Sequence, residues 1–343
     1  MPGQYRFSFG PWNLHEGADP FGPPVRPTRE FTEKLDIAVR LGFQGIQFHD
    51  DDVVPADLPA GQLERGVRQV KQMLDDQGLA AEFIAPRLWE DPRTADGPVT
   101  SNRADERQYA LDRSKRAVDI ARIIGTRDIV WWPAREGTYI RESKDARASF
   151  QRMLDYANAL LEYDPEIRIL GEMKPNEPMD LMYMPTTGHF LSLCYRTVDP
   201  TRAGVLIESA HCVLAGLDPS DEMAFALWHG KLWSVHLNDQ NGLKFDQDKT
   251  FGTVDLRRAF NQVNVLERAN YGQNGEWVGL DVKAMRTQPF DLAWKHLQNS
   301  KEIFSQLVEV SRRIDRQEWQ DFVDRRDYEG LELFILRNLM GLR

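Results

Sequence analysis

The sequence is poor in cysteine and has no long apolar run. Its 343 residues include two cysteines, Cys194 and Cys212, which allow at most one disulfide and form no ligand pair. Such low usage is typical of a reducing compartment. No apolar stretch approaches the roughly 20 residues of a membrane helix, and the first ten residues, MPGQYRFSFG, lack the pattern of a secretory signal. We therefore expect a cytoplasmic protein without membrane association.

An excess of positive charge is also missing. Acidic residues outnumber basic ones by 53 to 43, and the formal net charge is −10. Most of such a surface would repel polyphosphate, which argues against a nucleic-acid partner. What is present is ample apolar material, because 41% of the residues are hydrophobic and 28% are charged, a balance that supports a sizeable core.

Short β-rich runs alternate with longer amphipathic runs along most of the chain. The candidate strands are 5–9, 45–48, 80–85, 128–132, 168–172, 204–207, 232–237 and 277–282, and helical patterns include 28–41, 105–125, 144–162, 219–229 and 255–268. Eight strand–helix units predict an α/β fold, a (β/α)8 TIM barrel over residues 1–300. A doubly wound sheet is less favoured, because it usually has fewer strands and often a glycine-rich phosphate loop, which this sequence lacks.

The last residues change character. Residues 301–343 are helical in pattern and highly charged, and they do not form a ninth unit. We expect a short helical C-terminal extension that serves in oligomerisation.

The active site of a TIM barrel lies at the carboxyl ends of its strands, so residues there are candidates for function. Glu172, Glu208 and Asp281 close three different strands, and three carboxylates in one small volume need a counter-cation. A hard divalent metal such as magnesium or manganese is the usual solution. The alternative is local pairing of each carboxylate, for example of Glu172 with Lys174.

A second metal site is expected beside the first. Asp246 and Asp248, in the segment KFDQD after the seventh strand, can reach one cation together. His211 lies three residues after Glu208, so Glu208 would bridge both sites and His211 would add a nitrogen ligand. Acidic pairs in solvated loops are common without metal, which is the competing interpretation of Asp246 and Asp248.

Other rim residues suggest acid–base and wall functions. His49, oriented by Asp52, could be a general base, although the HDDD segment could equally cap a helix. The indoles that lie near strand ends could form flat walls that exclude water or could belong to the core; they are Trp12, Trp89 and Trp132. Asn238 and Lys283 are polar groups at the same rim, where we expect them to contact substrate.

Several motifs occur in the order and at the spacing found in D-xylose isomerases. They are FGPWN at 9–13, DPFG at 19–22, FHDDD at 48–52, WWPAREG at 131–137, GEMKPNEP at 171–178, HLNDQNGLKFDQD at 236–248 and LDVK at 280–283. Over residues 1–300 the sequence thus resembles this family. The resemblance implies a (β/α)8 barrel, two divalent metal ions such as magnesium, manganese or cobalt, a small-molecule sugar substrate and aldose–ketose isomerisation by a metal-assisted hydride shift.

The resemblance also implies roles for individual residues. One metal would be bound by Glu172, Glu208, Asp281 and position 236, and the other by Glu208, His211, Asp246 and Asp248. His49 with Asp52 would assist ring opening, and Lys174 would stabilise charge on the carbonyl oxygen. Trp12 and Trp132 would line the hydride path, together with Phe21 from a neighbouring subunit of a homo-oligomer, either a dimer or a tetramer.

Departures from the family pattern bear on metal and substrate. His236 occupies a position where the family has aspartate, which should weaken magnesium relative to manganese, cobalt or zinc. Trp89 replaces a phenylalanine, and Arg87 adds a cation beside the pocket. We expect an aldose–ketose isomerase. The alternatives are a sugar epimerase on the same barrel and an inactive homologue that binds sugar and metal within a complex. A metal-dependent phosphodiesterase is less favoured, because it would be expected to carry more histidine ligands and a basic groove.

Overall fold

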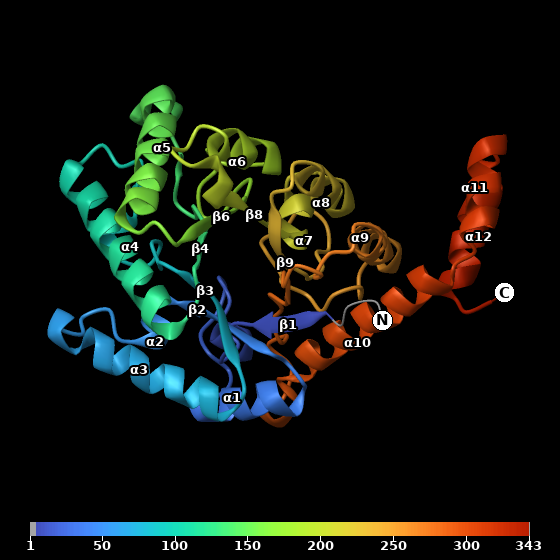
Figure 1. Ribbon diagram of the computed structural model, residues 1–343, viewed down its shortest axis with the longest axis horizontal. Coiled ribbons are helices and arrows are strands. Elements are labelled where there is room, and N and C mark those ends of the chain that lie inside the picture. The colour runs from blue at the N-terminus through green and yellow to red at the C-terminus, as the bar shows by residue number, and fades with distance from the viewer. Residues whose placement is uncertain (1–4, 343) are drawn as a thin grey trace.

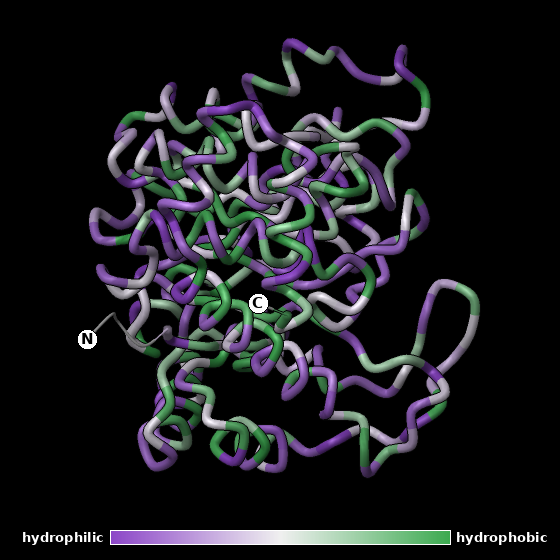
Figure 2. The backbone as a smooth tube through the Cα atoms, turned by 90° about the vertical axis from the view of Figure 1, so that its right-hand side faces the viewer, coloured by the Kyte–Doolittle hydropathy of each residue, from purple (hydrophilic) through white to green (hydrophobic). Residues whose placement is uncertain are grey.

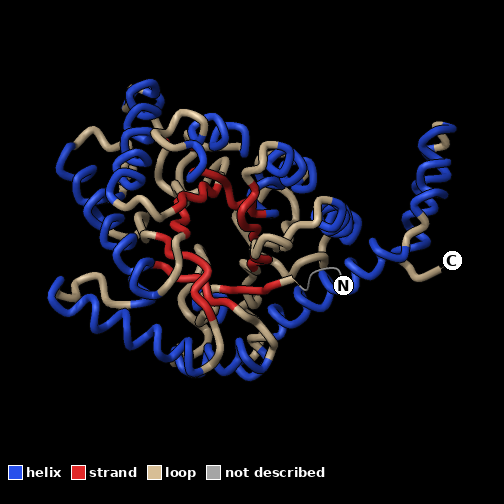
Figure 3. The backbone as a smooth tube through the Cα atoms, in the orientation of Figure 1, coloured by secondary structure: helices blue, strands red, loops and turns tan. Residues whose placement is uncertain are grey.

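The computed structural model describes residues 5–342 and contains a closed barrel of parallel strands. The strands follow one another around the barrel in the order β1, β10, β9, β8, β6, β4, β3, β2, and Figure 3 shows them as an inner ring within a layer of helices. Their bounds are Arg6–Phe9 (β1), Gly45–His49 (β2), Ala80–Ala85 (β3), Asp128–Trp131 (β4), Arg168–Glu172 (β6), Ala203–Glu208 (β8), Leu232–His236 (β9) and Trp277–Gly279 (β10). The predicted TIM barrel and its eight strands are confirmed.

The barrel strands form because their residues are apolar on both faces, as parallel strands covered by helices require. Every residue of β2, β4 and β8 is buried, and hydrophobic residues gather in the middle of the molecule in Figure 2. The register between strands matters for the site. Glu208, the last residue of β8, lies opposite His236, the last residue of β9, and His236 in turn lies opposite Gly279 of β10.

Helices cover the outside of the barrel (Figure 1). Their bounds are Phe31–Arg40 (α1), Asp50–Val53 (α2), Ala60–Asp76 (α3), Ala104–Ile124 (α4), Ala146–Tyr163 (α5), Thr187–Cys194 (α6), Ser209–Leu214 (α7), Pro219–Trp228 (α8), Leu256–Arg268 (α9) and Lys295–Arg313 (α10). Local signals set several ends. Asp145 and Asp255 accept hydrogen bonds from backbone amides at the starts of α5 and α9, and α4 ends at Gly125, whose φ of 100° is left-handed.

The C-terminal helices divide at Arg313 and not at residue 300. Helix α10 crosses the expected boundary and packs on the barrel, where the Phe304 ring contacts Tyr5 and Phe7 edge-on. Helices α11 (Arg316–Arg325) and α12 (Tyr328–Leu339) pack on each other and project away from the barrel (Figure 1). Ile335 is the one buried residue in these two helices.

A small two-stranded sheet lies outside the barrel. It pairs β5 (Gly137–Thr138) with β7 (Leu181–Met182) in antiparallel fashion and so ties together the loops that follow β4 and β6. Across residues 5–342, none of the helices combines the length and apolar character needed to cross a membrane.

Candidate metal centre

A cavity of about 1190 Å³ opens at the carboxyl ends of the barrel strands. Most of the site residues expected from the sequence line it; these are Trp12, His49, Trp89, Trp132, Glu172, Lys174, Glu208, His211, His236, Asp246, Asp248, Asp281 and Lys283. Phe21, Asp52 and Asn238 are not among its lining residues. The rim therefore brings together side chains from all eight barrel strands or the segments that follow them.

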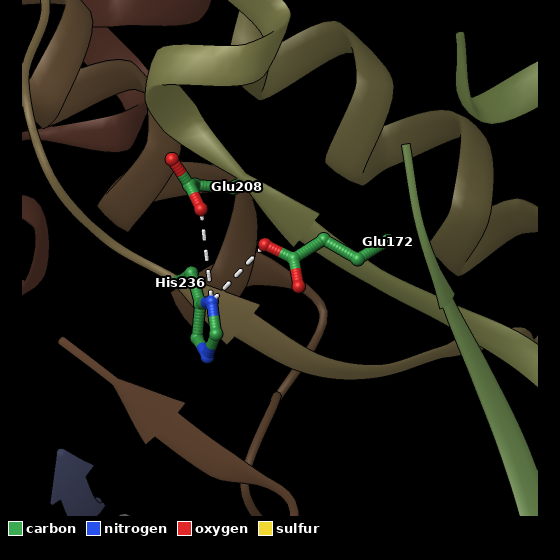
Figure 4. Close-up of side chains that lie close together, drawn as sticks. All are labelled: Glu172, Glu208 and His236. Carbon is green, nitrogen blue, oxygen red and sulfur yellow. Dashed lines mark hydrogen bonds and ion pairs between the residues drawn. The ribbon is translucent and has the colours of Figure 1, made fainter. Parts of the chain in front are cut away.

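Three side chains at adjacent strand ends form what we call the strand group: Glu172, Glu208 and His236. Glu172 ends β6, Glu208 ends β8 and His236 ends β9, and all three are buried. His236 Nδ1 lies 3.3 Å from Glu172 Oε1 and 3.7 Å from Glu208 Oε2, as Figure 4 shows. One ligand atom from each residue fits within a set whose members are all within 4.8 Å of one another.

A second set, the loop group, shares Glu208 and adds His211 and Asp246. His211 lies on α7, and Asp246 lies in the loop that follows β9. His211 Nε2 is 3.0 Å from Asp246 Oδ2 and 3.3 Å from Glu208 Oε1. The ligand atoms of this set also lie within 4.8 Å of one another, so Glu208 is the carboxylate common to both groups.

Two expected ligands stand beside these groups. Asp281 Oδ1 accepts hydrogen bonds from Trp12 Nε1 at 2.9 Å and Asn13 Nδ2 at 2.7 Å, while its Oδ2 lies 3.8 Å from His236 Nδ1. Asp248 forms an ion pair with Lys283. The structure thus assembles five of the seven expected ligands into two groups, with Asp281 facing the strand group and Asp248 held by a lysine.

Crowding of buried carboxylates perturbs their protonation. Burial raises the pKa of the Glu208 carboxyl well above its usual range, and the neighbouring Asp246 carboxylate adds to the effect. Burial also raises the pKa of Asp248, again with a contribution from Asp246. For Glu172, burial acts in the same direction, but the imidazoles of His236 and His211 outweigh it and lower the pKa to about 2.

The two imidazoles respond in the opposite sense. Burial alone would lower the pKa of His236, but the Glu172 carboxylate raises it well above its ordinary value. His211 behaves similarly, with Glu208 and Asp246 raising its pKa against burial. Positive charge at the centre of these carboxylates is therefore strongly favoured.

The residues present suit a divalent metal ion. His211 Nδ1, His236 Nε2 and Asp246 Oδ1 are buried without a hydrogen-bond partner among the described residues, and the carboxylates that surround them repel one another. Carboxylate oxygens and imidazole nitrogens are together the ligands of manganese, cobalt and zinc, whereas magnesium prefers oxygen alone. Each group could hold a metal ion.

Lys174 lies beside the loop group. Its Nζ donates to Asp246 Oδ2 at 2.9 Å, lies 3.2 Å from Glu177 Oε2 and sits 5.1 Å from the centroid of the Trp132 ring. Burial would lower the pKa of Lys174, but the carboxylates of Asp246 and Glu177 raise it, so the side chain is a buried cation. Among the described residues, Lys174 forms no ion pair with Glu172, the partner that the alternative of local pairing predicted.

His49 ends β2 and carries its ring into the cavity. Its Nδ1 lies 2.9 Å from Asp52 Oδ2, and its backbone N–H donates to the same oxygen at 2.9 Å as α2 begins. Asp52 therefore both orients the imidazole and caps the helix, which unites the two interpretations of the HDDD segment. Burial acts to raise the pKa of Asp52, but His49 and Arg87 lower it, so this partner is a carboxylate.

Arg87 is fully engaged by protein groups. Its Nε donates to Asp51 at 2.7 Å, one terminal nitrogen donates to Glu90 at 3.0 Å, and the other lies 3.2 Å from Asp52 and 2.7 Å from His49 Nδ1. The cation that the sequence places beside the pocket is thus neutralised by three carboxylates. It braces His49 and offers no free charge to an anionic ligand.

Aromatic rings form much of the wall. The Trp12 and Trp89 rings lie 4.2 Å and 5.1 Å from the His49 ring, and Trp132 stacks over His211 with an angle of 5° between the planes. Phe21 is 80% exposed and contacts Phe245 at the outer rim.

Asn238 faces the ligands and not the cavity. Its Nδ2 donates to Glu208 Oε1 at 2.9 Å and to Asp248 Oδ1 at 3.1 Å, and its Oδ1 accepts from the Ala210 backbone N–H. The side chain is 1% exposed, so it holds the carboxylates where we had expected it to touch substrate.

Sequence reasoning missed a buried polar network inside the barrel. Glu82 of β3 accepts hydrogen bonds from Ser8, from Ser234 Oγ at 2.5 Å and from Gln47 Nε2 at 3.0 Å. A signal was available, because polar residues in the middle of parallel strands buried on both faces are unusual.

Comparison with known proteins agrees with this architecture. Residues 35–288 match the family described as xylose isomerase-like TIM barrel. Similar solved structures include a D-tagatose 3-epimerase-like protein (13% identity, TM-score 0.65, 90% of this chain and 98% of that chain). Another is 3-keto-D-glucoside 4-epimerase from E. coli (14% identity, TM-score 0.63, 87% of this chain and 100% of that chain). A third is an IolI protein with a bound zinc atom (13% identity, TM-score 0.61, 88% of this chain and 98% of that chain).

At these identities the solved structures establish the fold, and the family match establishes descent. It covers most of the barrel, from α1 to the segment after β10, and includes all the residues of both ligand groups. The chain belongs to the xylose isomerase-like TIM barrel family.

Proposed function

We propose that the protein is a sugar isomerase that binds two divalent metal ions and interconverts an aldose and a ketose by hydride shift. The observation that carries the proposal is the sharing of Glu208 by two ligand groups. Glu172, Glu208 and His236 would hold one divalent ion and Glu208, His211 and Asp246 a second. Divalent ions there would supply Lewis-acid polarisation of the oxygens of an open-chain sugar. Manganese or cobalt suits the two imidazoles better than magnesium does.

The residues around the groups support this reaction. Lys174, fixed by Asp246 and Glu177, is a cation that can donate a hydrogen bond to a carbonyl oxygen as negative charge develops there. Trp12, Trp89 and Trp132 present apolar faces, which exclude the water that would protonate a transferring hydride.

His49 would open the sugar ring. Its orientation by Asp52 leaves Nε2 toward the cavity, where it can move a proton between the anomeric hydroxyl and the ring oxygen. Because Arg87 also lies against Nδ1, it would hold the imidazole plane during that transfer.

A sugar epimerase is the second candidate, since similar solved structures include proteins named as sugar epimerases. Epimerisation by proton transfer exchanges a carbon-bound hydrogen with solvent, whereas a hydride shift retains it. The two reactions can therefore be distinguished in D2O, by whether deuterium appears at the reacting carbon.

The decisive experiment follows a panel of aldoses and ketoses by NMR in D2O, with protein that has been stripped and reloaded with magnesium, manganese or cobalt. Interconversion without deuterium at the reacting carbon is the expected result. Deuterium incorporation would indicate the epimerase, and sugar binding without turnover would indicate an inactive homologue. Lys174→Met is the matched variant, expected to retain both metals and lose turnover.

We also propose that α11 and α12 mediate assembly with a second copy of the chain. These helices project from the barrel, and apolar side chains are exposed on α12, at Leu333 and Leu336, and just after it, at Met340 and Leu342. Light scattering after chromatography should give a dimer or a tetramer, and truncation after Arg313 should give a monomer.

A further inference from the structure

The two nitrogens of His236 have different surroundings. Nδ1 faces Glu172 and Glu208 at the strand group, whereas Nε2 is buried with no hydrogen-bond partner among the described residues. An imidazole that binds a metal through Nδ1 carries its proton on Nε2, and that N–H needs an acceptor. Leaving a buried donor unpaired is costly, so the acceptor should be found nearby.

Gln47 has an unpaired hydrogen-bond acceptor that could serve this donor. Its Oε1 is also buried without a partner, and the side chain is fully buried. Gly279 shows how close the two residues are, because a Cβ added there would lie 2.3 Å from Gln47 Nε2 and 2.9 Å from His236 Cδ2. Cδ2 is bonded to Nε2, so the edge of His236 that carries the unpaired nitrogen and the Gln47 amide both lie against the same glycine.

The other end of the Gln47 amide is anchored. Its Nε2 donates to Glu82 Oε2 at 3.0 Å and to Ser8 Oγ at 3.2 Å. Glu82 is itself held by hydroxyl donors from Ser8 and Ser234. With Nε2 bound to acceptors, the amide orientation is fixed and Oε1 is left as the free acceptor.

We propose that Gln47 is a positioning residue for the metal centre, accepting the His236 Nε2–H directly or across one water, with Glu82 holding the amide in place. The contact fixes the His236 tautomer and ring plane so that Nδ1 presents its lone pair between Glu172 and Glu208. The polar core of the barrel thus serves as the outer support of a ligand and not only as packing. The inference rests on the strand group binding a metal, as the proposed function requires.

The first test uses unmodified protein. In the zinc-loaded chain with 15N-labelled histidine, NMR should show His236 protonated at Nε2 and metal-bound at Nδ1. A metal-bound Nε2, or a His236 that is not a ligand while zinc is bound elsewhere, would overturn the inference whatever the variants do.

The second test is a pair of substitutions measured by calorimetry. Gln47→Met keeps the volume and removes the acceptor, and it should weaken zinc binding at the strand group by about tenfold or more. Tyr156→Phe is the matched control, because it removes a buried hydrogen bond to Ser114 outside the barrel, and it should leave zinc affinity unchanged.

The same substitution in the His236→Asp background separates positioning from general packing. Aspartate has no N–H to hold, so Gln47→Met should then change affinity less than twofold. Equal losses in both backgrounds, or a loss no greater than that of Tyr156→Phe, would refute the role of Gln47. If the unmodified chain bound no metal at all, the proposed function itself would fail.

Discussion

The strand group and the loop group share Glu208 but are built differently. All three strand-group residues end neighbouring barrel strands, and the sheet register sets Glu208 directly opposite His236. The loop group instead draws Asp246 from the segment after β9, and the cation of Lys174 is already paired with that carboxylate. One group is fixed by the sheet, and the other must exchange a lysine contact to bind an ion.

This difference leads us to expect a tight metal site and a weaker one. Ligands on strands need little reorganisation, so the strand group should bind first and release last. Asp246 is paired with Lys174, so binding of an ion by the loop group would compete with that contact.

Removing Glu208 should abolish metal binding by both the strand group and the loop group. Glu208→Ala takes away the shared bridge, so the bound metal should fall from two ions to none and turnover by about 10³-fold or more. Elemental analysis after dialysis measures the first and a sugar assay the second. Glu177→Gln, a change outside both groups, should keep two ions; two tightly bound ions in Glu208→Ala would refute the bridge.

Changing Asp246 should impair metal binding by the loop group only. Asp246→Asn removes an anionic ligand of the loop group, and we expect one bound ion in place of two, with turnover reduced about 100-fold. Calorimetric titration with manganese would show the high-affinity phase unchanged and the weaker phase lost. Loss of the tighter phase would reverse our ranking of the two groups.

Acid should weaken metal binding by both groups, and as the pH falls the affinity of the strand group should decline first. Carboxylates raise the pKa of both imidazoles, and that of His236 is raised well above its ordinary value. Metal binding needs the neutral ring, so affinity should decline about tenfold per pH unit as pH falls below each pKa. Titrations at several pH values, in buffers of different ionisation enthalpy, would also detect the released protons. A pH-independent affinity would contradict this competition.

His236→Asp should have the smallest effect, a change in the metal preference of the strand group. An oxygen ligand in place of nitrogen should shift the ratio of magnesium to manganese affinity by about tenfold, or roughly 1.4 kcal/mol. It should also remove the part of the acid sensitivity that the His236 imidazole contributes, whereas the part due to the Glu208 carboxyl remains. An unchanged ratio would show that position 236 is not a ligand.

The sequence was sufficient for the barrel and for the placement of the candidate ligands that end its strands. β-rich runs bounded by turn residues located all eight strands, and the rule that barrel sites lie at strand ends then placed Glu172 and Glu208 together. His211, three residues after Glu208, followed from the same rule.

Contacts between distant loops were beyond the sequence. Nothing local indicated that Asp248 pairs with Lys283, that Asn238 turns toward the carboxylates, or that Arg87 is enclosed by acidic neighbours. These outcomes depend on how loops pack, and several partners compete within a few ångströms. Helix α10 spans residue 300, where the change to a charged helical pattern had placed the start of the extension.

Gly279 restricts how this barrel can diversify. A side chain there would collide with both Gln47 and His236, so an inherited change at the end of β10 would disturb a candidate metal ligand. The end of β10 is therefore closed to side chains, whereas Trp89 lies on a segment that lines the cavity and belongs to neither ligand group. Evolution toward a new sugar, or a library designed to find one, has its freedom in that segment.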